Sequence, residues 1–255
     1  MLVNSGVFDV SLERMPRQPQ VARGGSCHLV KVNGKTALID TWDTHSPTSN
    51  MIEEGYFEHP GFKDVSVILK IQYYKCAYWD QMSQKLGKPI RPWTMFPNST
   101  WPLSPFKWTY KPHKLTGILT GKNDRFGRQP WVEWCMNQTD FEAGYNLRIE
   151  ESEFINKLLE CRWGLILKGK TKDHDGKNRR EVEYSSCGMP MVLTYQPTYD
   201  FPMVAGEHYV YLTKPAQLAQ LRDIDPRPYA ERSVELYHDH FSPQGMAKDL
   251  LKIMS

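Results

Sequence analysis

Short apolar runs alternate along this chain with polar turns and with segments of helical periodicity. In the first half, two apolar runs flank Asn33-Gly34, the strongest short signal for a β-hairpin. Residues 65–71 form an apolar run typical of a buried strand, and residues 78–86 predict a short helix. Residues 87–112 contain six prolines and three tryptophans. Because proline is excluded from helix interiors and central strands, this stretch predicts a linker.

The second half predicts strands that alternate with helices. The expected strands are residues 115–120, 164–167, 190–194 and 208–212. Between them, residues 150–163 have the apolar spacing of an amphipathic helix, and a helix is expected at 130–136. This alternation is typical of a parallel α/β sheet. Ser242-Pro243 then begins a last helix at 246–254, with the serine as its cap.

These patterns predict an α/β protein with two lobes, which 255 residues are sufficient to form. The N-terminal lobe is expected over residues 1–112, with the linker at about 87–112 as its last part. The second lobe is expected over 113–241. Residues 242–255 form the last helix, which we expect to return to the N-terminal lobe.

Composition adds limits on partners and compartment. The chain has 32 basic and 29 acidic residues, a net charge of +3, which gives no electrostatic reason to expect nucleic acid. Its five cysteines form no C-x-x-C motif and predict small buried side chains in a reducing compartment. The first residues have no signal-peptide pattern, and no apolar run is long enough to span a bilayer. We therefore expect a cytoplasmic protein.

The most informative stretch is residues 178–192, which predict a short helix, a tight turn and a strand. Arg180 and Glu183 lie three residues apart, so they share one helical face and can meet one ligand. A guanidinium suits phosphate oxygens, and a carboxylate can accept two hydrogen bonds from a ribose diol. Gly188 permits the turn after the helix. The pattern favours a nucleotide-sugar ligand.

This stretch resembles the donor-binding signature of the GT-B glycosyltransferases, R-x-x-E, four residues, then G-x-P-x-V. The resemblance extends upstream to residues 153–169 and downstream to 201–211, and covers about 115–255. Exostosin-type transferases are the nearest subfamily. It implies two Rossmann-like lobes with a cleft between them, and an enzyme that transfers sugar from a UDP-sugar, UDP-xylose among the candidates, to a glycan or glycoprotein. The donor is a substrate, so no cofactor is implied. In size and compartment the chain is similar to transferases of chloroviruses, which would place it in a host cytoplasm.

Further donor contacts are expected in two loops of the second lobe. Gly121 turns the chain after the first strand of this lobe, and three basic residues follow that can neutralise a diphosphate: Lys122, Arg125 and Arg128. The resemblance implies that the loop with Tyr145 and Arg148 holds the nucleobase. An ordinary loop and a solvated basic turn are the alternative interpretations.

An inverting transferase also needs a general base on the acceptor side. Asp43 and His45 follow an apolar strand and are both candidates, whereas Asp40 is expected to cap the turn. A retaining enzyme would need no such base, and the sequence does not decide between the two.

Two alternatives remain open. Asp173-His174-Asp175 matches the D-x-D of GT-A transferases, which would hold manganese through Asp173 and Asp175. The motif lies in a lysine-rich run and not at an apolar strand end, so we predict a loop and no bound metal. The other alternative is a non-catalytic module that binds a nucleotide or a glycan.

Overall fold

The chain forms two compact units in a computed structural model. Unit 1 contains Met1–Met95, Thr198–Asp200 and Ser242–Ser255, and unit 2 contains Phe96–Pro197 and Phe201–Phe241. The structure describes residues 10–14, 27–40, 60–70, 77–93, 108–110, 119–121, 127–141, 143–145, 151–167, 179–197 and 203–255.

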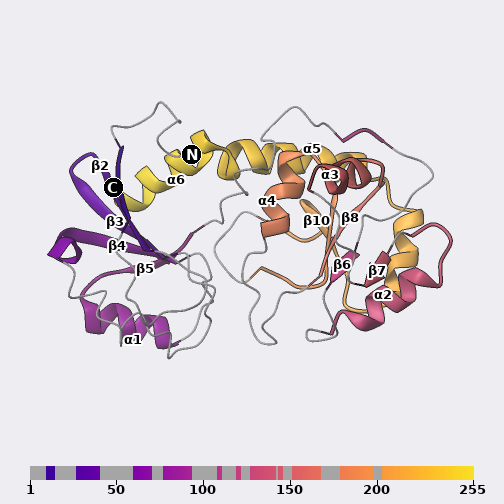
Figure 1. The fold of residues 1–255 in the computed structure, drawn as a ribbon, viewed down its shortest axis with the longest axis horizontal. Helices are drawn as coiled ribbons and strands as arrows, with labels where there is room; N and C mark the ends of the chain where they lie inside the picture. The colour runs from indigo at the N-terminus through magenta and orange to yellow at the C-terminus, as the bar shows by residue number, and fades with distance from the viewer. Residues whose placement is uncertain are drawn as a thin grey trace. The chain divides into compact units, whose positions relative to one another are not determined.

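Unit 1 is built on a five-stranded mixed sheet with the order β1-β2-β3-β4-β5 (Figure 1). Its strands are β1 (Val10–Arg14), β2 (Cys27–Val32), β3 (Lys35–Asp40), β4 (Val65–Lys70) and β5 (Ile90–Pro92). β2 pairs antiparallel with both β1 and β3, whereas β4 pairs in parallel with both β3 and β5. The 3-10 helix Pro60–Asp64 precedes β4, and α1 (Ala77–Leu86) packs against β5.

The hairpin predicted at Asn33-Gly34 is confirmed, because β2 and β3 flank these two residues and pair antiparallel. Asn33 has φ 49° and Gly34 has φ 77°. Two consecutive positive φ angles define the type I′ turn, whose twist matches that of the flanking strands. This turn sets the register that buries Leu38 and Ile39.

The linker prediction is wrong for the first part of residues 87–112. Ile90–Pro92 forms β5, which pairs in parallel with β4. The strand is possible because β5 lies at the edge of the sheet and Pro92 is its last residue, so the missing proline N–H interrupts no central ladder. Trp93 follows, is only 3% exposed, and donates its backbone N–H to the carbonyl of Lys70 at 2.9 Å.

The last helix, α6, runs over Pro243–Met254, so it begins three residues before the predicted start at 246, and the predicted serine cap is confirmed. Ser242 caps it by accepting the backbone N–H of Gly245 at 3.0 Å. At its other end, the ammonium of Lys35 donates to the carbonyls of Met254 and Ser255, which are among the carbonyls that a helix leaves without internal partners. In Figure 1, α1 and α6 lie on opposite sides of the unit 1 sheet.

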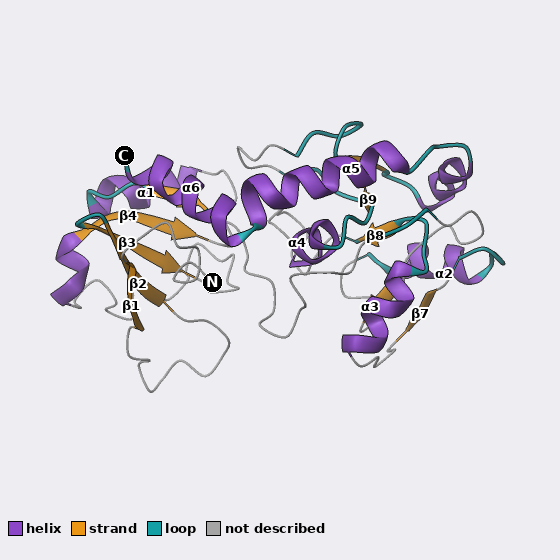
Figure 2. Ribbon diagram, turned by 90° about the horizontal axis from the view of Figure 1, so that it is seen from above, coloured by secondary structure: helices purple, strands orange, loops and turns teal. Residues whose placement is uncertain are grey.

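Unit 2 contains two parallel sheets, so the predicted parallel α/β class is confirmed here. One pairs β6 (Leu119–Gly121) with β7 (Ala143–Tyr145), and the other has the order β10-β9-β8. The strands of the second sheet are β8 (Gly164–Ile166), β9 (Met191–Leu193) and β10 (Tyr209–Tyr211). The described helices of unit 2 are α2 (Gln129–Met136), α3 (Glu151–Leu159), α4 (Arg179–Ser186), the 3-10 helix Pro215–Arg222, α5 (Arg227–Leu236) and the π-helix Tyr237–Phe241 (Figure 2).

The helix predicted over 150–163 is shorter in the structure. It ends at Leu159, and Cys161 closes the final turn through a 2.9 Å bond from its N–H to the carbonyl of Leu158. Residues 160–163 form the turn that leads from α3 into β8 at Gly164. The periodicity of the apolar residues continues through this turn, which is why the pattern overestimated the helix.

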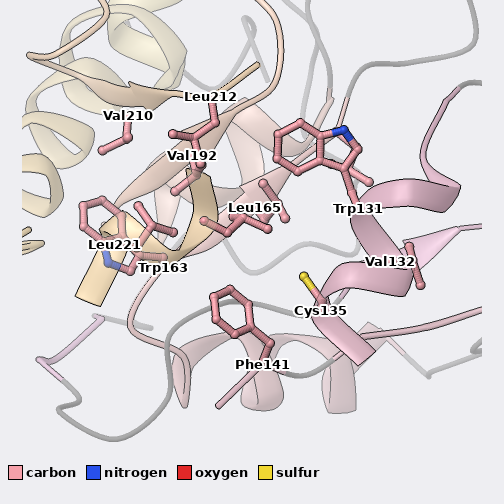
Figure 3. Close-up of a cluster of buried hydrophobic side chains, with 12 residues drawn as sticks. Trp131, Val132, Cys135, Phe141, Trp163, Leu165, Val192, Val210, Leu212 and Leu221 are labelled. Atoms are coloured by element: carbon pink, nitrogen blue, oxygen red, sulfur yellow. The ribbon is translucent and has the colours of Figure 1, made fainter. Parts of the chain in front are cut away.

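One hydrophobic cluster joins α2 to the three-stranded sheet of unit 2. Trp131 and Cys135 of α2 pack in the same buried group as Leu165 of β8 and Val192 of β9 (Figure 3). Burial of such side chains stabilises by about 1.5–3 kcal/mol each. The first turn of α2 is thus held in a fixed position beside β8 and β9.

Trp108 connects the end of α4 to the chain before β8 through two hydrogen bonds. Its backbone N–H donates to the carbonyl of Cys187, just after α4, at 2.8 Å. Its indole N–H donates to the carbonyl of Cys161, before β8, also at 2.8 Å. Cys161 and Cys187 are both buried free thiols, as the sequence predicts.

The contact between α4 and β8 leaves room for no side chain at residue 164. A Cβ placed on Gly164 would lie 2.6 Å from the ring of Tyr184 on α4 and 2.7 Å from the side chain of Met189. Tyr184 is 2% exposed and has no open space to move into. The glycine therefore fixes how closely α4 approaches the sheet.

At the carboxyl end of the unit 1 strands lies a buried ion pair. Asp40, the last residue of β3, pairs with Lys70, the last of β4, at 2.7 Å, and the two side chains are 3% and 1% exposed. The turn that Asp40 is expected to cap begins at residue 41, outside the described residues, so that expectation stays a prediction. Desolvating two charges costs several kcal/mol, so the pair requires both partners to be present.

Among the residues that the structure describes, no helix is both long enough and apolar enough to cross a membrane.

We predict that Gly164→Ala lowers the free energy of unfolding by about 1–3 kcal/mol, because the new methyl group overpacks against Tyr184. Gly34→Ala is the comparison, since nothing lies within 4 Å of its Cβ and only its positive φ opposes the change. Urea denaturation measures both. A Gly164→Ala variant as stable as the wild type would contradict the packing argument.

We predict that Lys70→Met lowers the free energy of unfolding by about 3–5 kcal/mol, because it leaves the buried Asp40 carboxylate without its ammonium partner. The double variant Asp40→Leu/Lys70→Met should recover most of this loss, since apolar pairs of similar volume often replace buried ion pairs without cost. Urea denaturation again reports the result. Additive losses would show that the two side chains do not act as a pair.

Candidate functional site

The candidate site lies where the parallel strands of unit 2 end. In open α/β sheets, ligands bind beyond the carboxyl ends of the strands, where helices begin. Strand β8 ends at Ile166 before α4 begins at Arg179, and β9 ends at Leu193. In the two-stranded sheet, the predicted residues Gly121 and Tyr145 are register partners at the carboxyl ends of β6 and β7. The structure therefore brings these two together.

The helix, turn and strand predicted around Arg180 and Glu183 are confirmed. Arg180 and Glu183 are on α4, Gly188 has φ 68°, and β9 begins at Met191. Nη1 of Arg180 donates to Oε2 of Glu183 at 2.7 Å. The Glu183 side chain has no exposed surface, whereas that of Arg180 is 30% exposed. The pair is thus a partly buried one, with the guanidinium on the accessible side.

Arg128 occupies the N-cap position of α2, where its carbonyl accepts the N–H groups of Trp131 and Val132, each at 3.1 Å. Its side chain is half-buried. Burial lowers the pKa of Arg128, nearby Tyr195 acts in the opposite direction, and the charge of Arg180 lowers the pKa further. A guanidinium remains protonated in spite of such shifts. The sequence predicted both arginines for one ligand, and the structure places them within electrostatic range of each other.

Two further residues of this region were missed by the sequence analysis. The hydroxyl of Tyr195 donates to Oε1 of Glu181 at 2.6 Å. Glu181 is 0% exposed and Tyr195 is 3% exposed. Burial raises the pKa of Tyr209 to about 12, with the charge of Glu181 as the next contribution. Glu181 adjoins the motif in sequence, but its partner is 14 residues away and no spacing rule connects them.

The distribution of these four charges favours an anionic ligand. The carboxylates of Glu181 and Glu183 are completely buried, while Arg128 and Arg180 are only partly buried. Positive charge therefore lies on the side that a ligand can reach, supported from behind by negative charge. An anion would relieve both the repulsion between the guanidiniums and the desolvation of Arg128.

The remaining predicted site residues lie outside the described part of the chain: Lys122, Arg125, Arg148, Asp43, His45, Asp173 and Asp175. Their roles stay predictions. Within the described ranges, no group of three or more His, Cys, Asp or Glu side chains is arranged to hold a metal ion.

No known protein family matches the chain, and no curated protein matches it. Solved structures are similar to it at low sequence identity. TarM is 8% identical with a TM-score of 0.48, over 79% of this chain and 46% of TarM. The pneumococcal O-GlcNAc transferase GtfA, solved with UDP and GlcNAc, is 9% identical with a TM-score of 0.41, over 84% of this chain and 48% of GtfA. The chain spans just under half the length of these proteins.

We predict that Glu183→Gln lowers the free energy of unfolding by about 1–3 kcal/mol, because it removes the charged partner of a partly buried ion pair. The matched control is Glu235→Gln on α5. Arg232 and Glu235 have the same three-residue spacing and the same 2.7 Å distance, but their side chains are 49% and 56% exposed. Exposed pairs contribute about 0–1 kcal/mol, so the control should change little in thermal and urea unfolding. Equal effects would show that burial gives Glu183 no special role.

Proposed function

We propose that this protein is a glycosyltransferase that takes its sugar from a nucleotide-sugar, with the diphosphate of the donor held by Arg128 and Arg180. The observation that carries the proposal is that two partly buried guanidiniums, each on a helix that begins after a parallel strand, lie within electrostatic range of each other. Glu183 holds Arg180 in place at 2.7 Å. Like charges gathered in a partly desolvated place are costly unless a ligand of opposite charge compensates them.

The reaction needs stabilisation of the leaving group more than any other effect. The bond between the anomeric carbon and the diphosphate oxygen breaks, and that oxygen keeps the electron pair. A new bond forms between the anomeric carbon and an acceptor hydroxyl oxygen, whose proton passes to a base. Negative charge grows on the diphosphate as the sugar leaves, and fixed guanidiniums stabilise it without further reorganisation. Arg128 and Arg180 supply this charge.

The finer assignments rest on the sequence. The signature around Arg180 supports an exostosin-type GT-B enzyme of two lobes with a cleft, for which a UDP-sugar, UDP-xylose included, is the first donor to test. The sequence predicts Glu183 as the ribose contact, but its side chain is completely buried, so we assign it to holding Arg180 instead. Gly121, Lys122, Arg125, Tyr145 and Arg148 are the proposed further donor contacts. Asp43 or His45 is the proposed base for a glycan or glycoprotein acceptor.

We predict that Arg180→Ala weakens binding of UDP by about tenfold to a hundredfold, the loss of a charge-assisted hydrogen bond of about 1.5–3 kcal/mol. Isothermal titration calorimetry measures the affinity, and a thermal-shift panel of UDP- and GDP-sugars identifies the donor by selective stabilisation. Arg232→Ala is the control, because it removes an exposed arginine with the same ion-pair geometry from unit 2.

Three outcomes separate the possibilities. Selective stabilisation followed by sugar transfer or donor hydrolysis supports the enzyme. Binding of UDP without turnover of any nucleotide-sugar supports a non-catalytic nucleotide-binding module instead. Equal affinities of wild type, Arg180→Ala and Arg232→Ala would remove the assignment of Arg180 to the donor.

A further inference from the structure

Close packing and a main-chain hydrogen bond hold the carboxyl end of α4. A Cβ on Gly164 would lie 2.6 Å from the ring of Tyr184, so the helix and β8 are in direct contact there. Just beyond the helix, the carbonyl of Cys187 accepts the backbone N–H of Trp108 at 2.8 Å. A displacement of α4 would therefore be largest at its amino end, which bears Arg180.

Glu181 ties this amino end to the sheet. It lies in the first turn of α4, is 0% exposed, and its Oε1 accepts the hydroxyl proton of Tyr195 at 2.6 Å. Tyr195 follows a residue that is still bonded to the sheet, because the N–H of Thr194 donates to the carbonyl of Ile166, the last residue of β8, at 3.3 Å. The hydrogen bond of Glu181 thus connects the first helix turn to the carboxyl ends of β8 and β9.

The hydrogen bond between Arg180 and Glu183 cannot supply this connection, because both residues are on α4. It orients the guanidinium relative to the helix and moves with the helix. The first turn of a helix also frays readily, since its N–H groups have no partners within the helix. A contact between this turn and the strand ends, where ligands of α/β sheets bind, fixes the position of the guanidinium relative to the ligand.

We propose that Glu181 and Tyr195 are positioning residues for Arg180: their hydrogen bond holds the first turn of α4 against the sheet and so places the guanidinium for an anion. That this anion is the diphosphate of a nucleotide-sugar rests on the proposed function, but the positioning itself can be measured with inorganic pyrophosphate. Neither positioning residue has to touch the ligand. Their effect on affinity should therefore depend on Arg180.

Two substitutions of Glu181 separate positioning from electrostatics. Glu181→Gln removes the charge but keeps an oxygen that accepts the Tyr195 hydroxyl, so pyrophosphate should bind at least as tightly as to wild type. Glu181→Met removes both the charge and the acceptor, and should weaken pyrophosphate about threefold to tenfold, the range of one hydrogen bond. A purely electrostatic role predicts tighter binding to both variants, since each loses a negative charge. Equal affinities of the two variants in isothermal titration calorimetry would overturn the proposal.

A double-mutant cycle tests whether Tyr195 acts through Arg180. Tyr195→Phe changes no charge and should weaken pyrophosphate and UDP about threefold to tenfold, while uridine, which has no phosphate, binds as before. Arg180→Lys keeps the charge on a flexible stem without the planar fork, so Tyr195→Phe should change pyrophosphate affinity by less than about twofold in this background. Additive effects in the cycle, or an equal loss for uridine, would contradict positioning.

Hydrogen exchange reports on the helix turn without any ligand. Tyr195→Phe should speed amide exchange in a peptide that covers Arg179–Ser186, and unchanged exchange would overturn the proposal. Tyr229→Phe is the control, because Tyr229 packs against the hydrophobic cluster of unit 2 and its hydroxyl should affect neither exchange in α4 nor pyrophosphate affinity. If Tyr195→Phe does not fold, the comparison of Glu181→Gln with Glu181→Met decides, and if Glu181→Met does not fold, the cycle decides.

The result can be distinguished from failure of the proposed function. Coupling between Tyr195 and Arg180 for pyrophosphate in a protein that transfers no sugar supports the positioning residues and removes the transferase. Sugar transfer with a strictly additive cycle does the opposite. A wild-type protein that binds no pyrophosphate overturns the positioning proposal, whatever its activity.

Discussion

Glu183 carries its charge in the interior of unit 2 with no exposed surface, and Arg180 supplies the positive charge that makes this burial tolerable. An isolated carboxylate in such a place would be neutralised or would destabilise the fold. The carboxylate of Glu183 in turn holds the long side chain of Arg180 in one geometry. A guanidinium whose position is fixed before a ligand arrives loses less entropy when it binds.

The same arrangement is repeated with different chemistry on the other side of α4. Glu181 is buried as deeply as Glu183, but its partner is the neutral hydroxyl of Tyr195. One helix turn thus holds two carboxylates, and both direct a neighbouring polar side chain. Because the negative charges are inside and the arginines are at the accessible side, the local field favours anions even though the four formal charges cancel.

Much of this region follows from local sequence rules. Arg180, Glu183, Gly188 and the strand at Met191 lie within a dozen residues, so the spacing of residue types determines them directly. Local spacing does not predict side-chain partners that are distant in the sequence. The contact between Tyr195 and Glu181 depends on where β9 ends relative to α4, and the pairing of Lys70 with Asp40 depends on the register of β3 and β4. The prolines also led to a wrong linker prediction at Ile90–Pro92. An edge strand such as β5 can contain Pro92, because the missing N–H interrupts no hydrogen-bond ladder, as it would in a central strand.

The position of Trp108 has a practical consequence. Its two hydrogen bonds reach the carbonyls of Cys187 and Cys161, which lie after α4 and before β8. A fragment that begins at residue 113, after the proline-rich stretch, would lack Trp108 and therefore both hydrogen bonds that connect the end of α4 to the chain before β8. A fragment for separate expression of the second unit should therefore begin before Trp108. This start lies within residues 87–112, which the composition alone predicts to be a linker.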